Sequence, residues 1–374
     1  MKQHIYADNA ATTQMDKAAF DAMVPWLLEQ YGNASQPYAF SREPKKALAE
    51  ARATIANCIG ANPDEIFFTS GGTESDNWVI KSSAFSDCLH RATITSSFEH
   101  HAVLKSCALI ERLGYPVAYV HPTKEGQILP EALSTLITNS TRLVSIMLAN
   151  NEIGSIQPIK SLCDIAHQHG ALFHTDAVQA IGHIKVDVHE LGVDYLSASA
   201  HKFNGPKGIG FLYIRSGTEL LPFSDGGSQE KGYRAGTENI ASIVGMSEAL
   251  RRNCDSIEAN IDHIGRLDNR LITKLRESGI EFWRNGSKDT LPGLLSLSFP
   301  GRDGETILHR LDLMGISIST GAACDSENTK VSHVLQAIRL DEDHAKGTVR
   351  ISLGKNNTMD DIDQIVSALV RVLS

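Results

Sequence analysis

Apolar positions along the chain repeat with two spacings, which predict helices alternating with strands. The segments 16–30 and 43–58 show helical spacing, and in the second one Leu48, Ala51 and Ile55 share a face. Short runs that are apolar almost throughout are typical of buried strands. Such runs lie at residues 66–68, 92–95, 143–149, 172–175, 195–198 and 209–214.

Helix-like segments between these runs, such as 158–168, predict the βα alternation of a largely parallel sheet. The long amphipathic stretch 257–277 then leads into shorter strands and helices. We therefore predict an α/β protein with a mostly parallel mixed sheet flanked by helices, plus a smaller α+β domain. The predicted large domain spans 15–255, and the small domain combines 1–14 with 256–374.

Composition narrows the class of protein. Hydrophobic residues make up 42% and charged residues 21% of the 374 positions, as in ordinary globular proteins. The net charge of −9 argues against a nucleic-acid-binding role. The chain start has no apolar signal segment and no apolar run reaches the roughly 18 residues of a membrane span. We expect a cytoplasmic protein with no membrane partner.

The six cysteines are scattered along the sequence, at positions 58, 88, 107, 163, 254 and 324. They form no Cys-x-x-Cys pair and no cluster with histidines at zinc spacing, so we expect neither a disulfide framework nor a metal site. Five of them lie in helix-like or apolar contexts typical of inert thiols. Cys324 differs, because the polar, small-residue segment around it predicts an exposed loop and a reactive thiol.

The segment Ser199-Ala-His201-Lys202 directly follows a predicted strand. A lysine in such a loop often only faces water. Serine and histidine next to it, however, can bind a phosphate, and the amine can form a Schiff base with pyridoxal phosphate. This combination makes Lys202 a candidate cofactor-binding residue.

Asp176 follows another strand, at the sheet edge where α/β proteins bind ligands. A carboxylate there can keep a pyridine nitrogen protonated, and Gln179 can donate to a ring hydroxyl. The alternative is that Asp176 only caps a helix.

The turn Thr69-Ser-Gly71-Gly72-Thr73 joins a strand to a predicted helix, so its free backbone N–H groups can hold an anion. His100 and His101 follow a third strand, and adjacent positions do not share a face as metal ligands would. One of the two histidines can stack on a ring, or both can be loop residues.

Eight ordered motifs together resemble the cysteine desulfurases, within the class V aminotransferase branch of the fold type I pyridoxal-phosphate enzymes. They cover nearly the whole chain: Tyr6-Ala-Asp-Asn-Ala-Ala-Thr-Thr, Thr69-Ser-Gly-Gly-Thr-Glu-Ser-Asp-Asn, Glu99-His, Asn150-Asn-Glu-Ile-Gly, Asp176-Ala-Val-Gln, Ser199-Ala-His-Lys, Arg234-Ala-Gly-Thr and Arg350-Ile-Ser-Leu-Gly.

The resemblance implies a role for each matched residue. It implies that Lys202 is the Schiff-base lysine, that His100 stacks on the cofactor ring, and that Asp176 and Gln179 contact the ring nitrogen and oxygen. The implied phosphate ligands are Gly72, Thr73, Ser199, His201 and, from the second subunit of a homodimer, Thr237. The implied ligands of the substrate carboxylate are Arg350 and Asn151, the latter also next to the cofactor, with Asn33 as a weaker candidate.

The resemblance also implies the reaction, in which L-cysteine is converted to L-alanine. Lys202 would remove the Cα proton, Cys324 would take the sulfur as a persulfide, and His100 would assist protonation. The distance from Cys324 to Ser332 resembles the long loop of the group that supplies iron-sulfur cluster assembly. The sulfur acceptor can be a cluster scaffold, a thiolation protein or a small thiol.

Two departures from the family keep other functions open. Asp325 replaces a small hydroxyl residue after Cys324, and a neighbouring carboxylate disfavours the thiolate. The segment 33–38 also departs from the family form. The alternatives are a selenocysteine lyase, another class V enzyme such as an aminotransferase, or a non-catalytic sulfur-relay or scaffold partner.

Overall fold

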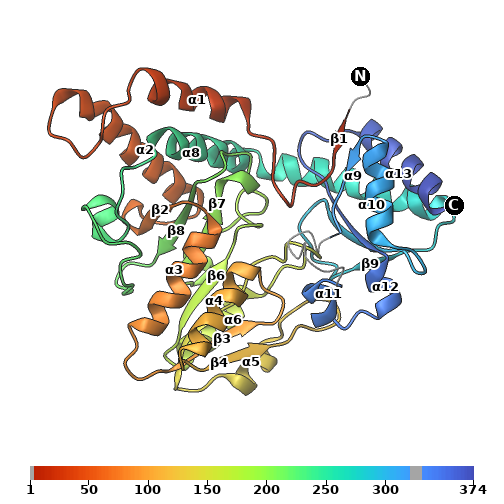
Figure 1. Cartoon of the computed structure of the whole chain (residues 1–374), viewed down its shortest axis with the longest axis horizontal. Coiled ribbons are helices and arrows are strands. Elements are labelled where there is room, and N and C mark those ends of the chain that lie inside the picture. Colours follow the sequence, from red (N-terminus) through yellow and green to blue (C-terminus); the bar gives the residue numbers. More distant parts are fainter. Residues whose placement is uncertain (1–3, 321–330) are drawn as a thin grey trace.

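The computed structural model describes residues 4–320 and 331–374, and Figure 1 shows its two larger sheets with their helices. The larger sheet has seven strands in the order β2-β8-β7-β6-β5-β3-β4. Its strands are β2 (Ile66–Thr69), β3 (Ala92–Ser96), β4 (Val117–Val120), β5 (Thr141–Ser145), β6 (Leu172–Asp176), β7 (Tyr195–Ser199) and β8 (Gly210–Ile214). Strands β7, β6, β5, β3 and β4 are parallel, whereas β8 is antiparallel to both of its neighbours.

Helices cover both faces of this sheet, which explains the continuously apolar strands. Neighbouring strand residues point to opposite faces, so Leu143 packs with α3 (Gly72–Phe85) and α4 (His101–Arg112), and Val144 packs into the other core. That second core contains residues of α2 (Arg42–Cys58), α6 (Ile159–Gln168) and α8 (Ile240–Asp255). The predicted mostly parallel sheet flanked by helices is confirmed.

The connecting elements mostly agree with the sequence pattern. The helices predicted at 16–30, 43–58 and 158–168 are α1 (Lys17–Leu28), α2 and α6. The predicted strand 143–149 extends too far in the C-terminal direction, because β5 ends at Ser145. Beyond it, single main-chain bonds from Ile146 to His174 and from Leu148 to Asp176 lead the chain to the edge of the sheet. Two short helices, α5 (Pro130–Leu136) and α7 (Val188–Leu191), complete this part.

A second sheet, antiparallel and three-stranded, has the order β12-β10-β9. Its strands are β9 (Trp283–Asn285), β10 (Leu294–Ser298) and β12 (Thr348–Ser352), and its core includes α9 (Ile257–Glu277), α10 (Gly304–Leu313) and α13 (Met359–Leu373). The short helices α11 (His333–Ala337) and α12 (Glu342–Lys346) precede β12. The predicted boundary at 255/256 stays a prediction; Leu291, Leu294 and Val334 belong to the core of the larger sheet.

The N-terminal segment joins the two parts. Strand β1 (Ile5–Tyr6) pairs in parallel with β11 (Ile316–Ser317), and Asp8 forms a bridge to Ser352 at the end of β12. From there the chain crosses to the larger sheet, where the Thr13 N–H bonds to the His201 carbonyl. Among the described helices, none has the length and apolar character to cross a membrane.

Candidate active site

A cavity of about 300 Å³ lies at the carboxyl ends of β6 and β7. Asp176 is the last residue of β6, Ser199 is the last residue of β7, and Lys202 ends the 3-10 turn that follows β7. Strands that run in parallel deliver their carboxyl ends to one edge of the sheet, so these three residues meet there. Ten predicted site residues line the cavity: Gly72, Thr73, His100, Asn151, Asp176, Gln179, Ser199, His201, Lys202 and Arg350.

Lys202 is held against the N-terminal segment. Its Nζ donates to the carbonyl oxygens of Ala10 at 2.5 Å and Ala11 at 2.9 Å. The Gln179 side chain also donates to the Ala10 oxygen, at 2.8 Å. Residues 10 and 11 therefore form one wall of the cavity, a role that the apolar sequence Ala-Ala gave no reason to expect.

The start of helix α3 forms an anion-binding corner. Gly71 has a φ of +147°, and a Cβ on Gly72 would lie 2.5 Å from Cγ2 of Val178. The two glycines thus allow a close approach of the turn to the β6 loop. Backbone N–H groups at the start of this 14-residue helix carry partial positive charge, and Ser199 lies opposite them.

His201 completes this corner as a neutral side chain. Burial, followed by the charges of Lys202 and Lys207, lowers the pKa of His201 to about 4. Its Nδ1 lies 3.1 Å from the Thr12 hydroxyl. A neutral imidazole can donate one hydrogen bond to a phosphate without adding charge.

Asp176 is held by its own turn. Its Oδ1 accepts the Val178 N–H at 2.9 Å, and the residues after it form a turn, so it caps no helix. Burial raises the pKa of Asp176, whereas His100, the Val178 N–H and Lys202 lower it. A cationic ring nitrogen placed in the cavity would therefore find a buried carboxylate to pair with.

A second buried carboxylate, Asp76, lines the same cavity as Asp176. Its Oδ1 is 3.6 Å from Nε2 of His174. The His174 ring bonds through Nδ1 to the Ser145 hydroxyl at 2.8 Å and through Nε2 to the Ser197 hydroxyl at 2.9 Å. Burial, followed by the charge of Asp176, raises the pKa of Asp76 well above its ordinary value. Burial lowers the pKa of His174 to about 3. The sequence interpretation missed both residues, although Asp76 lies one helical turn after Gly72.

His100 and His101 have different surroundings. The Nδ1 of His100 accepts the Ala102 N–H at 3.1 Å and so caps α4, which leaves the ring proton on Nε2. Burial is the largest effect on the pKa of His100 and lowers it, so the ring is neutral near pH 7. His101 lies outside the cavity, with its ring 4.7 Å from that of His333.

Arg350 reaches the cavity from β12, in the smaller sheet. Its side chain is 7% exposed and donates to the Asn151 carbonyl at 2.9 Å and to Asp8 at 2.8 Å. Within the described residues, its Nε has no hydrogen-bond partner. A buried guanidinium with an unused donor can bind a carboxylate.

Two of the predicted residues, Thr237 and Asn33, do not line this cavity. Thr237 lines another cavity, of about 250 Å³, and Asn33 bonds through its side chain to the Ser35 N–H at 2.9 Å. Cys324, like Asp325, lies outside the described residues. The roles of these residues stay predictions.

The sequence that forms this cavity matches a known family. A family model described as "Aminotransferase class-V" matches residues 5–365. The chain belongs to the class-V aminotransferases. This class-V aminotransferase uses pyridoxal 5′-phosphate as its cofactor.

The curated relatives of this class-V aminotransferase include enzymes of sulfur metabolism. A cysteine desulfurase IscS from Dictyoglomus turgidum is 45% identical over 375 residues, covering all of this chain and 95% of that protein. A cysteine desulfurase IscS from Methanosarcina thermophila is 43% identical, covering 99% of this chain and 92% of that protein.

Solved structures agree with the sequence relatives. A structure titled "NIFS-LIKE PROTEIN" superimposes with a TM-score of 0.94 at 37% identity and covers 99% of both chains. A structure of SspA in complex with cysteine gives a TM-score of 0.84 at 34% identity, covering 95% of this chain and all of that one. The predicted fold type and family resemblance are thus confirmed.

Proposed function

We propose that this protein is a cysteine desulfurase that converts L-cysteine to L-alanine and passes the sulfur to Cys324 as a persulfide. The observation that carries this proposal is the single cavity that combines Lys202, Asp176 and the start of α3 with the Arg350 guanidinium. The first three suit pyridoxal phosphate, and the fourth suits an amino-acid carboxylate.

The residues of the cavity fit the cofactor in charge and in hydrogen-bonding groups. The N–H groups of Gly72 and Thr73, the Ser199 hydroxyl and the His201 ring would hold the phosphate at the helix start. The ring would lie against His100, with Asp176 at its nitrogen and Gln179 at its oxygen. When bound, pyridoxal phosphate supplies an electron sink for charge that develops at Cα of the substrate.

Lys202 has two tasks in this proposal. Its amine holds the cofactor before cysteine binds, and its Nζ then accepts the Cα proton of the substrate. The Ala10 and Ala11 carbonyl oxygens, which accept hydrogen bonds from Nζ here, would stabilise the ammonium that results.

Arg350 would orient the substrate through its carboxylate. The guanidinium is buried and its Nη1 is fixed by the Asn151 carbonyl, so its plane is set before cysteine arrives. Such preorganisation lowers the entropy lost on binding. The Asn151 side chain, which also lines the cavity, would add a second contact to the substrate or the cofactor.

The residues that flank the Cys324 segment support its role as sulfur acceptor. On one side, Ser319 exchanges two main-chain hydrogen bonds with Arg350. On the other, Ser332 donates to the Glu152 carboxylate at 2.5 Å, and the His333 ring bonds to the Glu99 carbonyl at 2.9 Å. One flank is therefore tied to the cavity residue Arg350, and the other to residues adjacent in sequence to Asn151 and His100.

The sulfur transfer balances without an external oxidant. The Cys324 thiolate attacks Sγ of the substrate and the Cβ–S bond breaks, so a persulfide forms on Cys324. The three-carbon fragment takes up protons and leaves as alanine, with the neutral His100 ring in position to assist. Cysteine and one thiol thus become alanine and one persulfide.

The proposal includes a homodimer, in which Thr237 of one subunit would contact the phosphate bound by the other. Thr237 lines a separate cavity and does not line the cofactor cavity of its own chain, which supports this assignment. The persulfide would go to a sulfur-acceptor protein, such as a scaffold for iron-sulfur clusters. We place the enzyme in the cytoplasm.

The test is alanine release from L-cysteine in the presence of dithiothreitol, on purified protein that shows the visible absorbance of bound cofactor. Wild type should release alanine and sulfide in equal amounts, and both Cys324→Ala and Lys202→Ala should abolish release. Full activity of Cys324→Ala would overturn the persulfide step and favour a lyase that acts directly on its substrate.

A further inference from the structure

A second cavity, of about 480 Å³, lies where α2, α8 and α9 meet. It shares no lining residue with the cavity around Lys202. One side is formed by the last turn of α2 and another by the last turn of α8; the loop 181–186 closes the third. Its volume is within the range of small-molecule sites.

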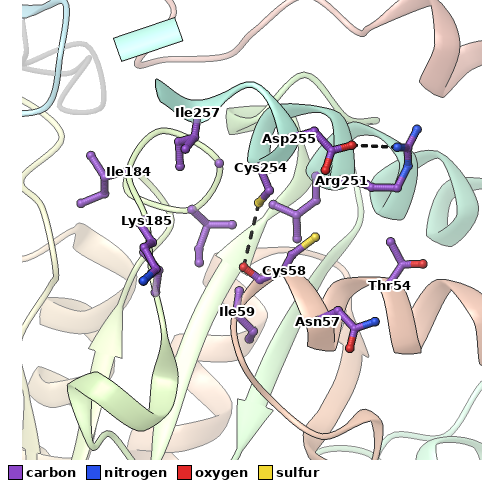
Figure 2. A pocket seen from close by; sticks show the side chains of 14 residues that line it. Thr54, Asn57, Cys58, Ile59, Ile184, Lys185, Arg251, Cys254, Asp255 and Ile257 are labelled. Carbon is purple, nitrogen blue, oxygen red and sulfur yellow. Dashed lines mark hydrogen bonds and ion pairs between the residues drawn. The ribbon is translucent and has the colours of Figure 1, made fainter. Parts of the chain in front are cut away.

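Two cysteines face each other in this cavity. Cys58 is the last residue of α2, Cys254 is the penultimate residue of α8, and the Cys254 thiol donates to the Cys58 carbonyl at 4.0 Å. Figure 2 shows the two side chains next to one another, with Ile184 and Lys185 across the pocket. Both cysteines are only partly buried, so a small reagent can reach them.

The two thiols differ in acidity because they interact. The neighbouring Cys254 thiol, together with burial, raises the pKa of Cys58, and the neighbouring Cys58 thiol lowers the pKa of Cys254. Cys254 is therefore the better nucleophile, and Cys58 keeps its proton. Stepwise thiol–disulfide exchange uses one cysteine to attack the disulfide and a second to release the mixed disulfide.

A metal does not explain the pair. Among the residues that the structure describes, no third cysteine, histidine or carboxylate joins Cys58 and Cys254 at ligand distance. Structural zinc sites use four protein ligands and catalytic ones use three. Two thiols beside a cavity suit covalent exchange with a small sulfur compound better.

We propose that Cys58 and Cys254 form a thiol–disulfide exchange site that takes a low-molecular-weight disulfide, with the cavity holding the small thiol of the mixed disulfide. The Cys254 thiolate attacks one sulfur of the disulfide and releases the first small thiol. Cys58 then attacks the Cys254 sulfur, loses its proton, and releases the second small thiol. The two cysteines lose two electrons as their bond forms, and the small disulfide gains them.

The resulting disulfide would join the C-terminal ends of α2 and α8. Cys58 and Cys254 are 196 positions apart in the sequence, and Ser256 is the single residue between the end of α8 and the start of α9. A cross-link between distant positions restricts the unfolded chain more than one between near positions. Oxidation at this site would therefore stabilise the junction through which α8 leads into α9.

The experiment uses the holoenzyme with glutathione disulfide as the probe, at increasing ratios to glutathione. Free thiols are then blocked with N-ethylmaleimide, and unreduced tryptic peptides are analysed by mass spectrometry. Wild type should yield a peptide pair linked through Cys58 and Cys254. Cys58→Ser should yield no linked pair and carry glutathione on Cys254, whereas Cys254→Ser should yield no linked pair and leave Cys58 blocked by N-ethylmaleimide.

Cys88, which is exposed, reports how far oxidation has progressed in the same sample. The proposal is overturned if Cys88 is fully modified while Cys58 and Cys254 are still blocked by N-ethylmaleimide, or if each carries its own glutathione. In a second measurement, oxidised wild type should unfold several degrees above reduced wild type. The same treatment should leave the midpoint of Cys58→Ser unchanged, and equal midpoints for oxidised and reduced wild type would overturn the stabilisation.

Discussion

The Arg350 guanidinium donates from Nη2 to the Asp8 carboxylate across 2.8 Å, which joins residues 342 positions apart in the sequence. Asp8 lies just after β1, whereas Arg350 lies in β12. Since Arg350 is buried and fixed on its other side by the Asn151 carbonyl, Asp8 decides how the remaining donors face the cavity. Asp8 is thus a positioning residue for the proposed carboxylate contact.

Replacement of this partner should weaken cysteine binding. We expect Asp8→Ala to raise KM for L-cysteine about tenfold, the scale of one lost charge-assisted hydrogen bond, with kcat changed only a few-fold. Asp8→Asn keeps an acceptor oxygen and should have a smaller effect. Tyr6→Phe is the control, because the Tyr6 hydroxyl bonds to main-chain oxygens of the same segment without touching Arg350. An unchanged KM in Asp8→Ala would rule out the positioning role.

The two buried carboxylates should respond differently to the same substitution. Asp176→Asn removes the charge proposed to face the ring nitrogen and should lower kcat roughly a hundredfold or more. Asp76→Asn should stay within a few-fold of wild type, because the raised pKa of Asp76 means that an amide replaces a protonated carboxyl of similar shape. Steady-state rates and the absorbance spectrum of the cofactor test this contrast. Equal losses of kcat in both variants would show that the assignment of the proton to Asp76 and of the charge to Asp176 is wrong.

Gly72 should not tolerate a methyl group. A Cβ there would lie 2.5 Å from Val178, so Gly72→Ala must shift either the start of α3 or the turn after β6. We expect cofactor affinity to fall at least tenfold, measured by fluorescence or absorbance titration. Gly265→Ala, in α9, is the matched control, because a Cβ there meets nothing within 4 Å. Similar affinity in both variants would contradict the close approach at α3.

Glu99 should make stability depend on pH. This carboxyl is fully buried, and burial raises its pKa from 4.5 to about 8 despite hydrogen bonds from Ser96 and the Met147 N–H. The folded state therefore holds the proton more tightly than the unfolded chain. The resulting stabilisation is complete below about pH 4.5 and is lost as pH rises toward about 8.

Urea unfolding of wild type and Glu99→Gln across this pH range measures the contribution. The free energy of unfolding of wild type should fall relative to the variant by up to about 1.4 kcal/mol per pH unit. Parallel pH profiles for the two proteins would mean that Glu99 does not titrate in this range.

Much of the fold and of the cofactor site could be predicted because it is encoded locally. The strands of the larger sheet are apolar on both faces, and the helices between them have their own period, so the βα alternation is visible in the sequence. Asp176, Ser199 and Lys202 each follow such a strand. Parallel strands end at the same edge, so the strand pattern alone predicts that these residues meet.

What the sequence by itself determined was therefore the class of fold, the cofactor chemistry and the residues carried by strand ends and turns. Tertiary structure alone decided that the Ala10 and Ala11 carbonyls hold Lys202, that Asp8 orients Arg350, and that Cys58 meets Cys254. The partners in these contacts are between 191 and 342 positions apart and belong to no common motif. Their proximity depends on how β1, β12 and the helices pack, and no local spacing records that packing.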